Sequence, residues 1–173
     1  MKNPTDLFKD YLECGNDPWR TRALTDRSFD YRVPESQTNV TLATYGDALL
    51  KFALCEILLD DFEELTIEKA KYESDVSLIK IARYYGLIDY LRFDRNDPRY
   101  PQDYRTRKTR ANATKTQRSN VRAFNHRRKY IATAMEAILG AMYKNHRDFD
   151  EIKTVVRGWM SILNEIVLNE DGK

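Results

Sequence analysis

Apolar residues recur at helical spacing along most of this chain. The longest such pattern covers residues 39–59, where Leu42, Tyr45 and Leu49 lie three or four positions apart. The same spacing predicts further helices over residues 5–14, 18–24, 66–86, 123–144 and 149–168. No stretch alternates between apolar and polar residues as a half-buried strand does. With only six Gly and five Pro in 173 residues, the pattern predicts an all-α fold. We expect residues 1–173 to form one domain of six or seven helices.

Residues 94–122 interrupt this pattern. Pro, Asp, Asn and Thr replace the apolar residues there, so we expect a long irregular loop. The loop overlaps a basic run, because ten Lys and Arg and no acidic residue lie between Arg105 and Lys129, which leaves 19 basic against 27 acidic residues elsewhere. Such a run favours either a polyanionic partner or a solvated loop, and composition leaves both open. The candidate contacts to a polyanion are Arg105, Arg107, Lys108, Arg110, Lys115, Arg118, Arg122, Arg127 and Arg128.

Two of the apolar segments each contain one notable acidic residue, Asp47 in the first and Glu136 in the second. An ionised carboxylate in such surroundings is costly unless it is paired, solvated or bound to a cation. Gly46 and Gly140 accompany them, and a glycine within a helix costs about 1 kcal/mol relative to Ala. Close approach of another helix is the usual reason for such a glycine. If the two helices meet at these glycines, the two carboxylates converge.

A shared site of two carboxylates suits Mg²⁺, which takes few protein carboxylates and keeps several of its waters. An ion held in this way can activate water and stabilise the charge that develops at a phosphodiester. The alternative is that each acid pairs with a nearby cation, because Lys51 lies four residues after Asp47 on the same helix face. The sequence has no His/Cys cluster, no glycine-rich phosphate loop and no nucleophilic Ser motif that would indicate other chemistry.

Four segments of the chain, in order, resemble the catalytic domain of ribonuclease III. Residues 39–50, Asn-Val-Thr-Leu-Ala-Thr-Tyr-Gly-Asp-Ala-Leu-Leu, are similar to the first signature motif of that family. Residues 132–141, Ala-Thr-Ala-Met-Glu-Ala-Ile-Leu-Gly-Ala, are similar to the second. Residues 23–29, Ala-Leu-Thr-Asp-Arg-Ser-Phe, resemble the element upstream of the first motif, and residues 74–87 resemble the helix between the two motifs.

The resemblance implies an activity and its site residues. Larger members of the family use four acids in each site, and here two of those positions hold Ala43 and Thr133. The mini-ribonuclease III branch has the same reduced pattern, lacks an appended double-stranded-RNA-binding domain, and has a basic loop before its second motif. The resemblance to this branch implies an Mg²⁺-dependent endoribonuclease, with Mn²⁺ as a substitute. Asp47 and Glu136 would hold the ion and be the catalytic residues, and the basic residues would contact RNA.

The resemblance also implies partners. These are double-stranded RNA, such as a stem in a ribosomal RNA precursor, and a second copy of the chain, with a ribosomal protein as a further candidate. The homodimer is also favoured by residues 42–59, which contain more apolar residues than one helix face needs, namely Leu49, Phe52, Ala53, Leu54 and Leu58. The loss of two acids fits an alternative function equally well, that of a catalytically inactive RNA-binding or structural module of a ribonucleoprotein.

The N-terminal residues contain no apolar signal region, and no apolar run approaches the length of a membrane span. We therefore expect a cytoplasmic protein with no membrane partner.

Overall fold

The computed structural model describes residues 4–60, 64–94 and 128–171. All regular elements in these ranges are helices, which confirms the all-α prediction, and the one extended pairing among them is an isolated bridge between Thr25 and Arg92. The helices are α1 (Pro4–Glu13), α2 (Pro18–Ala23), α3 (Val40–Leu58), α4 (Leu65–Glu73), α5 (Asp75–Tyr84), α7 (Lys129–His146) and α8 (Phe149–Asp171), with short 3-10 helices η1 (Glu35–Gln37) and η2 (Leu87–Asp89).

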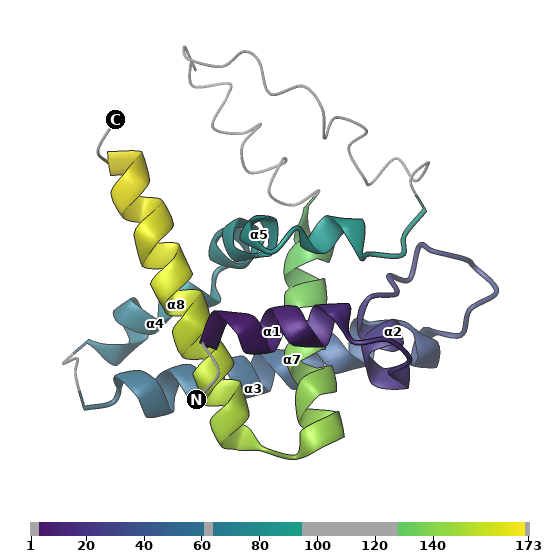
Figure 1. Ribbon diagram of the computed structural model, residues 1–173, viewed down its shortest axis with the longest axis horizontal. Helices are drawn as coiled ribbons and strands as arrows, with labels where there is room; N and C mark the ends of the chain where they lie inside the picture. Colours follow the sequence, from purple (N-terminus) through teal and green to yellow (C-terminus); the bar gives the residue numbers. More distant parts are fainter. Residues whose placement is uncertain (1–3, 61–63, 95–127, 172–173) are drawn as a thin grey trace, which may run out of the picture.

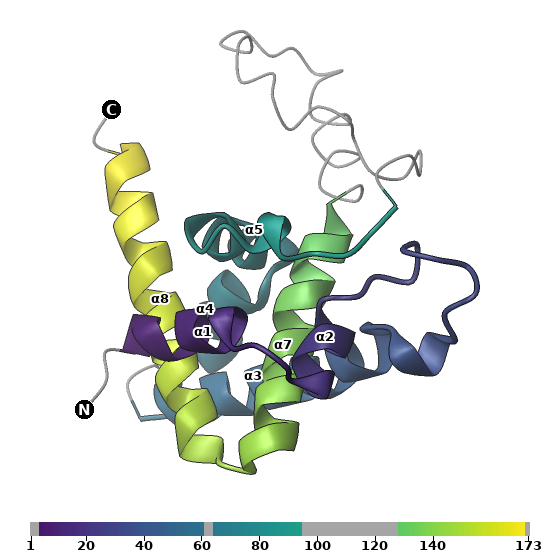
Figure 2. The same ribbon diagram turned by 45° about the vertical axis from the view of Figure 1, so that its right-hand side comes forward.

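Helix α7 lies at the centre of the molecule, where α3 crosses it and α8 runs beside both (Figure 1 and Figure 2). It packs against α2, α3, α5 and α8. Its interior residues are fully buried, and four of them are alanines, namely Ala132, Ala134, Ala137 and Ala141. Because these side chains are short, neighbouring helices can approach the α7 backbone closely from several sides. The position of α7 thus follows from its small, apolar composition.

Helix α3 closely follows its predicted range, and three of its five surplus apolar residues belong to the core. Ala53, Leu54 and Leu58 are 0%, 0% and 2% exposed, so they pack within the protomer and are not available to a partner. This corrects part of the reasoning that predicted a dimer. Leu49 is only half-buried and Phe52 is 55% exposed, so these two residues remain at the surface.

The single helix predicted over residues 66–86 is wrong, because the structure has two helices there. Ser74 separates α4 from α5 with an extended backbone (φ −67°, ψ 145°), and its side chain accepts a hydrogen bond from the backbone N–H of Ser77. A serine in this position caps the following helix and ends the preceding one. The apolar spacing continues through the break, which is why periodicity alone did not show it.

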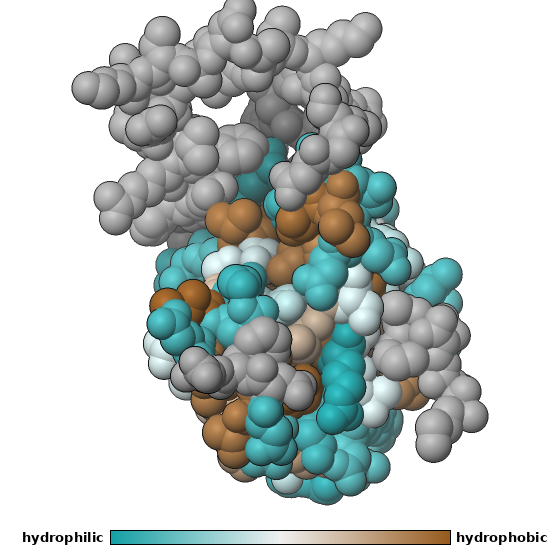
Figure 3. Space-filling view, turned by 90° about the vertical axis from the view of Figure 1, so that its left-hand side faces the viewer, coloured by the Kyte–Doolittle hydropathy of each residue, from teal (hydrophilic) through white to brown (hydrophobic). Residues whose placement is uncertain are grey.

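Helix α8 extends three residues beyond its predicted end. The prediction for residues 123–144 can be compared only from residue 128 onward, and there α7 begins at Lys129 and ends at His146. The last turns of α8 project past the helices that cover its first half (Figure 1), so Leu168 is 73% exposed. Glu170, near the end of α8, forms an ion pair with Lys80 of α5, with 2.6 Å between the charged atoms. On the α8 side of the molecule, apolar patches alternate with hydrophilic side chains (Figure 3).

Among the described residues, no helix combines the length and the apolar character that crossing a membrane requires.

Candidate active site

The site is built on the crossing of α3 and α7, where two glycines bring the helix backbones into contact. A Cβ atom on Gly46 would lie 1.7 Å from the backbone oxygen of Glu136, and a Cβ atom on Gly140 would lie 2.5 Å from the backbone oxygen of Leu42. Neither distance is compatible with any side chain larger than hydrogen. The close approach expected from the sequence is therefore present, and it explains why glycine occupies two helix interiors.

This crossing brings Asp47 and Glu136 to the same groove. Asp47 directly follows Gly46, and Glu136 is the residue whose carbonyl Gly46 contacts. Both carboxylates line a groove of about 1150 Å³. The groove is formed by residues of α3, α4, α5 and α7 and of the segment before α3, and its lining residues include Asp26, Arg27, Asn39, Val40, Ala43, Thr44, Lys51, Glu73, Ser74, Asp75, Lys129 and Thr133.

The electrostatics of the groove disfavour a second negative charge. Glu136 is half-buried, and its pKa is raised to about 7, chiefly because burial penalises the carboxylate and then because of the charges of Asp47 and Asp75. Lys129 and Lys51 act on this pKa in the opposite direction but are outweighed. A cation bound between the carboxylates would relieve this repulsion.

Asp47 has a partner of its own in the groove. The ammonium group of Lys51 donates a hydrogen bond of 2.6 Å to Oδ2 of Asp47, one helical turn earlier on α3. This is the pairing that the sequence offered as the alternative to a metal site. The two side chains are 49% and 36% exposed, respectively. Ion pairs with this degree of exposure typically contribute only about 0–1 kcal/mol, so the contact is weak.

Comparison with known proteins identifies the family. Residues 40–147 match the family model described as Ribonuclease III domain. The chain belongs to the ribonuclease III domain family. It is 31% identical over 128 residues to Ribonuclease 3 of Geobacter sulfurreducens, an alignment that covers 70% of this chain but only 43% of that protein. The chain thus spans less than half the length of this relative.

The fold agrees with a solved member of the family. The nuclease domain of ribonuclease III from Campylobacter jejuni superposes on this structure with a TM-score of 0.58, at 21% sequence identity. The superposition covers 95% of this chain and 96% of the other. At this level of identity the match establishes the ribonuclease III nuclease fold.

Within this ribonuclease III domain, the two positions that lack an acid also face the groove. Ala43 is buried and Thr133 is half-buried, and both line the groove with Asp47 and Glu136. Among the described residues, no group of three or more His, Cys, Asp or Glu side chains is arranged to hold a metal ion. Two carboxylates nevertheless fit Mg²⁺, because this ion needs only one or two protein carboxylates and keeps several waters. The charges of Asp47 and Asp75, which add to the larger effect of burial in raising the pKa of Glu136, support this fit, since a cation would compensate them.

Sequence reasoning missed several residues of the groove. Glu73 and Asp75 line it from the junction of α4 and α5, and the capping serine between them was the available signal. Asn39 lines it from the start of α3 and is 1% exposed. Neither Oδ1 nor Nδ2 of Asn39 has a hydrogen-bond partner within the described part of the chain. Because buried amides are normally hydrogen-bonded, Asn39 is a candidate to bind a water molecule or ligand in the groove.

Most of the residues predicted to contact RNA lie outside the described ranges. These are Arg105, Arg107, Lys108, Arg110, Lys115, Arg118, Arg122 and Arg127, together with most of the 94–122 loop. Arg128 is described and lies directly before α7, where it is 8% exposed. This buried position gives no support to a contact between Arg128 and phosphate.

Proposed function

We propose that this protein is a divalent-cation-dependent endoribonuclease that cleaves double-stranded RNA, of the mini-ribonuclease III type. The observation that supports it most is the glycine-mediated crossing of α3 and α7, which brings Asp47 and Glu136 into one groove. These are the two acidic positions that the mini branch keeps. Family membership supports the reaction class, and Ala43 and Thr133 at the other two positions support the mini type.

Asp47 and Glu136 would hold a Mg²⁺ ion, for which Mn²⁺ would substitute. When bound, such an ion supplies an activated water molecule and stabilises the charge that develops at a phosphodiester. The two carboxylates act by position, because the contact between Gly46 and the Glu136 backbone fixes the separation of the helices that bear them. Ala43 and Thr133 line the groove without adding charge, which leaves room for water beside the ion.

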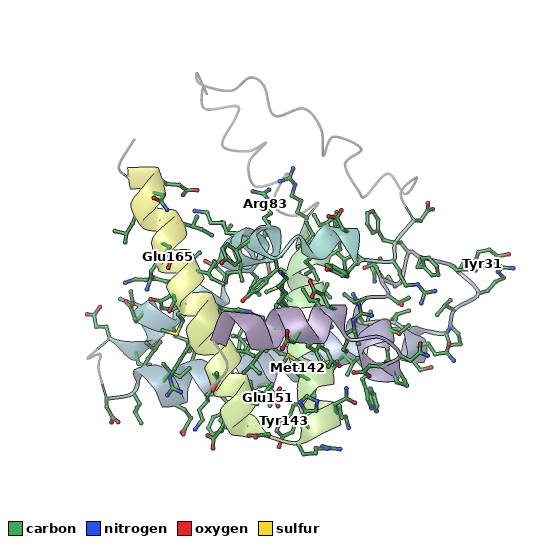
Figure 4. All side chains as sticks on the ribbon, viewed as in Figure 1. Tyr31, Arg83, Met142, Tyr143, Glu151 and Glu165 are labelled. Carbon is green, nitrogen blue, oxygen red and sulfur yellow. The ribbon has the colours of Figure 1, made fainter. Side chains whose placement is uncertain are left out.

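We further propose that the protein acts as a homodimer through the outer face of α3. Phe52 and Leu59 are 55% and 61% exposed on this face, and the Phe52 ring stacks on Phe149 of α8 at a centroid distance of 5.0 Å. The half-buried rings of Tyr45 on α3 and Tyr143, near the end of α7 (Figure 4), are 6.0 Å apart, and Lys144 and Arg147 lie over them. A cluster of large exposed apolar side chains is typical of a surface that a partner covers. A duplex would then lie across both protomers.

The RNA contacts are proposed for the basic segment. Its Lys and Arg residues would bind phosphates, and such contacts carry little sequence information. Recognition would therefore rest on the shape and backbone of an A-form duplex. A stem of a ribosomal RNA precursor, in the cytoplasm, is the substrate that the mini type suggests, with a ribosomal protein as a candidate accessory partner.

One contact favours a second function, that of a catalytically inactive RNA-binding or structural module. Lys51 already neutralises Asp47 at 2.6 Å, which is how a domain that no longer binds a cation could stabilise its remaining acid. In that case the protein would bind RNA and leave it intact.

Cleavage of long double-stranded RNA tests the proposal. We expect cleavage in Mg²⁺ and none in EDTA. Asp47→Asn and Glu136→Gln should each lower the cleavage rate by about 100-fold or more, since a direct ligand should matter more than the outer partners of a metal site, which typically account for 10- to 100-fold. Asp150→Asn, at an exposed carboxylate of α8, is the matched control and should cleave normally. Intact RNA with the wild-type protein in Mg²⁺, or normal rates in either groove variant, would reject the proposed site.

A further inference from the structure

Lys51 lies at the candidate site and forms an ion pair with one of its two carboxylates. It lies on the same face of α3 as Asp47, and its ammonium group lines the same groove as both carboxylates. Lys69 also pairs with a carboxylate of the groove, Glu73, but Lys69 itself does not line it. The lysines of the pairs Lys80–Glu170 and Lys153–Asp150 lie outside the groove as well. Lys51 thus places a positive charge beside the carboxylate that the proposed cation would bind.

Three carboxylates on three helices act on this ammonium group. Its pKa is raised first by the hydrogen bond to Asp47, and the charges of Asp47, Glu73 and Glu136 add to the effect. In return, its charge lowers the pKa of Glu136 against the stronger effect of burial. The ammonium group and a divalent ion would compensate the same negative charges.

The ion pair is nevertheless easy to replace. Both partners are partly exposed, at 49% for Lys51 and 36% for Asp47, so water can solvate the ammonium group when it leaves. The lysine stem is flexible, and Lys is a point charge that needs no fixed geometry. Only Oδ2 of Asp47 accepts the hydrogen bond that the structure shows. A divalent ion can thus displace Lys51 from Asp47. Breaking the ion pair costs free energy, which lowers the apparent affinity of the site for the ion.

We infer that Lys51 is a built-in competitor of the divalent cation, which holds the Asp47 carboxylate until an ion displaces it. This inference rests on the proposed function, because it assumes that Asp47 binds a cation. It adds that Lys51 sets how much divalent cation the site requires. Lys51 acts only through its contact with Asp47 and does not touch the reacting atoms.

The test is Mn²⁺ binding to the full chain without RNA, measured from the electron paramagnetic resonance signal of free Mn²⁺ at constant ionic strength. Lys51→Met keeps an unbranched side chain with good helix propensity and removes the charge. Its affinity for Mn²⁺ should rise about two- to fivefold, because loss of an exposed pair corresponds to at most about 1 kcal/mol. Lys51→Arg, which keeps the charge, should stay close to the wild type.

Lys80→Met is the matched control, since it also removes one positive charge from an ion pair but lies outside the groove. It should bind Mn²⁺ as the wild type does. Unchanged or weaker binding by Lys51→Met, or an equal gain in Lys80→Met, would overturn the inference.

Asp47→Asn distinguishes an error in the role of Lys51 from an error in the proposed function. If Asp47→Asn binds Mn²⁺ as the wild type does, the proposed cation site is wrong. If it loses binding while Lys51→Met is unchanged, only the role of Lys51 is wrong.

Discussion

Two faces of helix α3 differ in chemistry, because one is charged and the other is apolar. One face lines the groove with Thr44, Asp47 and Lys51, where negative charges are only partly compensated. The other presents Phe52 and Leu59, whose apolar surface is only partly covered. With about 100° of rotation per residue, a single helix can hold both faces without mixing them. Under the proposed function, the first face binds a cation and the second binds a protein partner.

The third face of α3 positions the other two. It is buried against α7, and contact between the two backbones at Gly46 fixes how far apart the helices lie. A change at this position should therefore damage both surfaces together. A change on either outer face should damage only its own function.

Gly46→Ala should have the largest effect on stability. The added Cβ atom would overlap the backbone oxygen of Glu136, which cannot move aside as a flexible side chain could. We expect a loss of about 3 kcal/mol or more in the free energy of unfolding. Gly15→Ala is the matched control, because a Cβ atom there would meet no atom within 4 Å. Urea denaturation of both variants measures the difference, and equal stability of the two would contradict the described crossing.

Phe52→Ser should affect the apolar face of α3 and leave the charged face unchanged. Full burial of a Phe side chain contributes about 1.5–3 kcal/mol, and the 55% of Phe52 that is exposed would supply about half of this. A symmetric interface loses that half twice, so the dimer should weaken by at least about tenfold. Affinity for Mn²⁺ should not change. Ile67→Ser, at an apolar residue of α4 with a similar exposure of 59%, should leave the dimer intact. Sedimentation at several concentrations measures the association. A wild-type protein that is monomeric at micromolar concentration would exclude this interface.

Glu136→Gln should show the smallest effect, a pH-dependent gain in stability without divalent ions. The pKa of Glu136 is raised from 4.5 to about 7 in the folded state, so folding favours its protonated form. Protonated Glu136 therefore makes its full contribution to the free energy of unfolding below about pH 4. This contribution is lost as the pH rises to about 7. Above pH 7 the variant should be more stable by about 1–2 kcal/mol, after allowance for solvent screening of a half-exposed group.

An acid with the opposite shift provides the control for this pH dependence. Lys153 lowers the pKa of Asp150, chiefly through their hydrogen bond, so any stability that this pair adds is lost as the pH falls. Asp150→Asn should therefore give no gain at high pH. Thermal unfolding in EDTA between pH 4 and pH 8 follows both variants. A constant difference between Glu136→Gln and the wild type across this range would contradict the raised pKa.

The sequence predicted the parts of the site that depend on spacing. Apolar periodicity indicated α3 and α7, and the cost of a glycine within a helix indicated that Gly46 and Gly140 mark a close contact. Periodicity did not indicate the break at Ser74, because the apolar spacing continues across it. The contribution of Glu73 and Asp75 to the groove was therefore missed, since it depends on how α4 and α5 turn against each other.

The ion pair of Lys51 shows a different limit. The spacing of four residues indicated that Lys51 can reach Asp47, and the structure confirms the contact. Spacing says nothing about the other charges around an ammonium group. The effects of Glu73 and Glu136 on Lys51 depend on tertiary structure. The same holds for the proposed dimer face, because the sequence alone could not distinguish the buried residues Ala53, Leu54 and Leu58 from the exposed Phe52.

A double-mutant cycle on Mn²⁺ affinity tests most directly whether Asp47 and Glu136 share one cation. The wild type, Asp47→Asn, Glu136→Gln and the double variant are compared at one pH and ionic strength. If both carboxylates hold the same ion, each single substitution should weaken binding by about tenfold or more, and the double variant should lose little beyond the weaker single variant. Losses that multiply in the double variant, or a single variant with wild-type affinity, would show that the two carboxylates do not form one site.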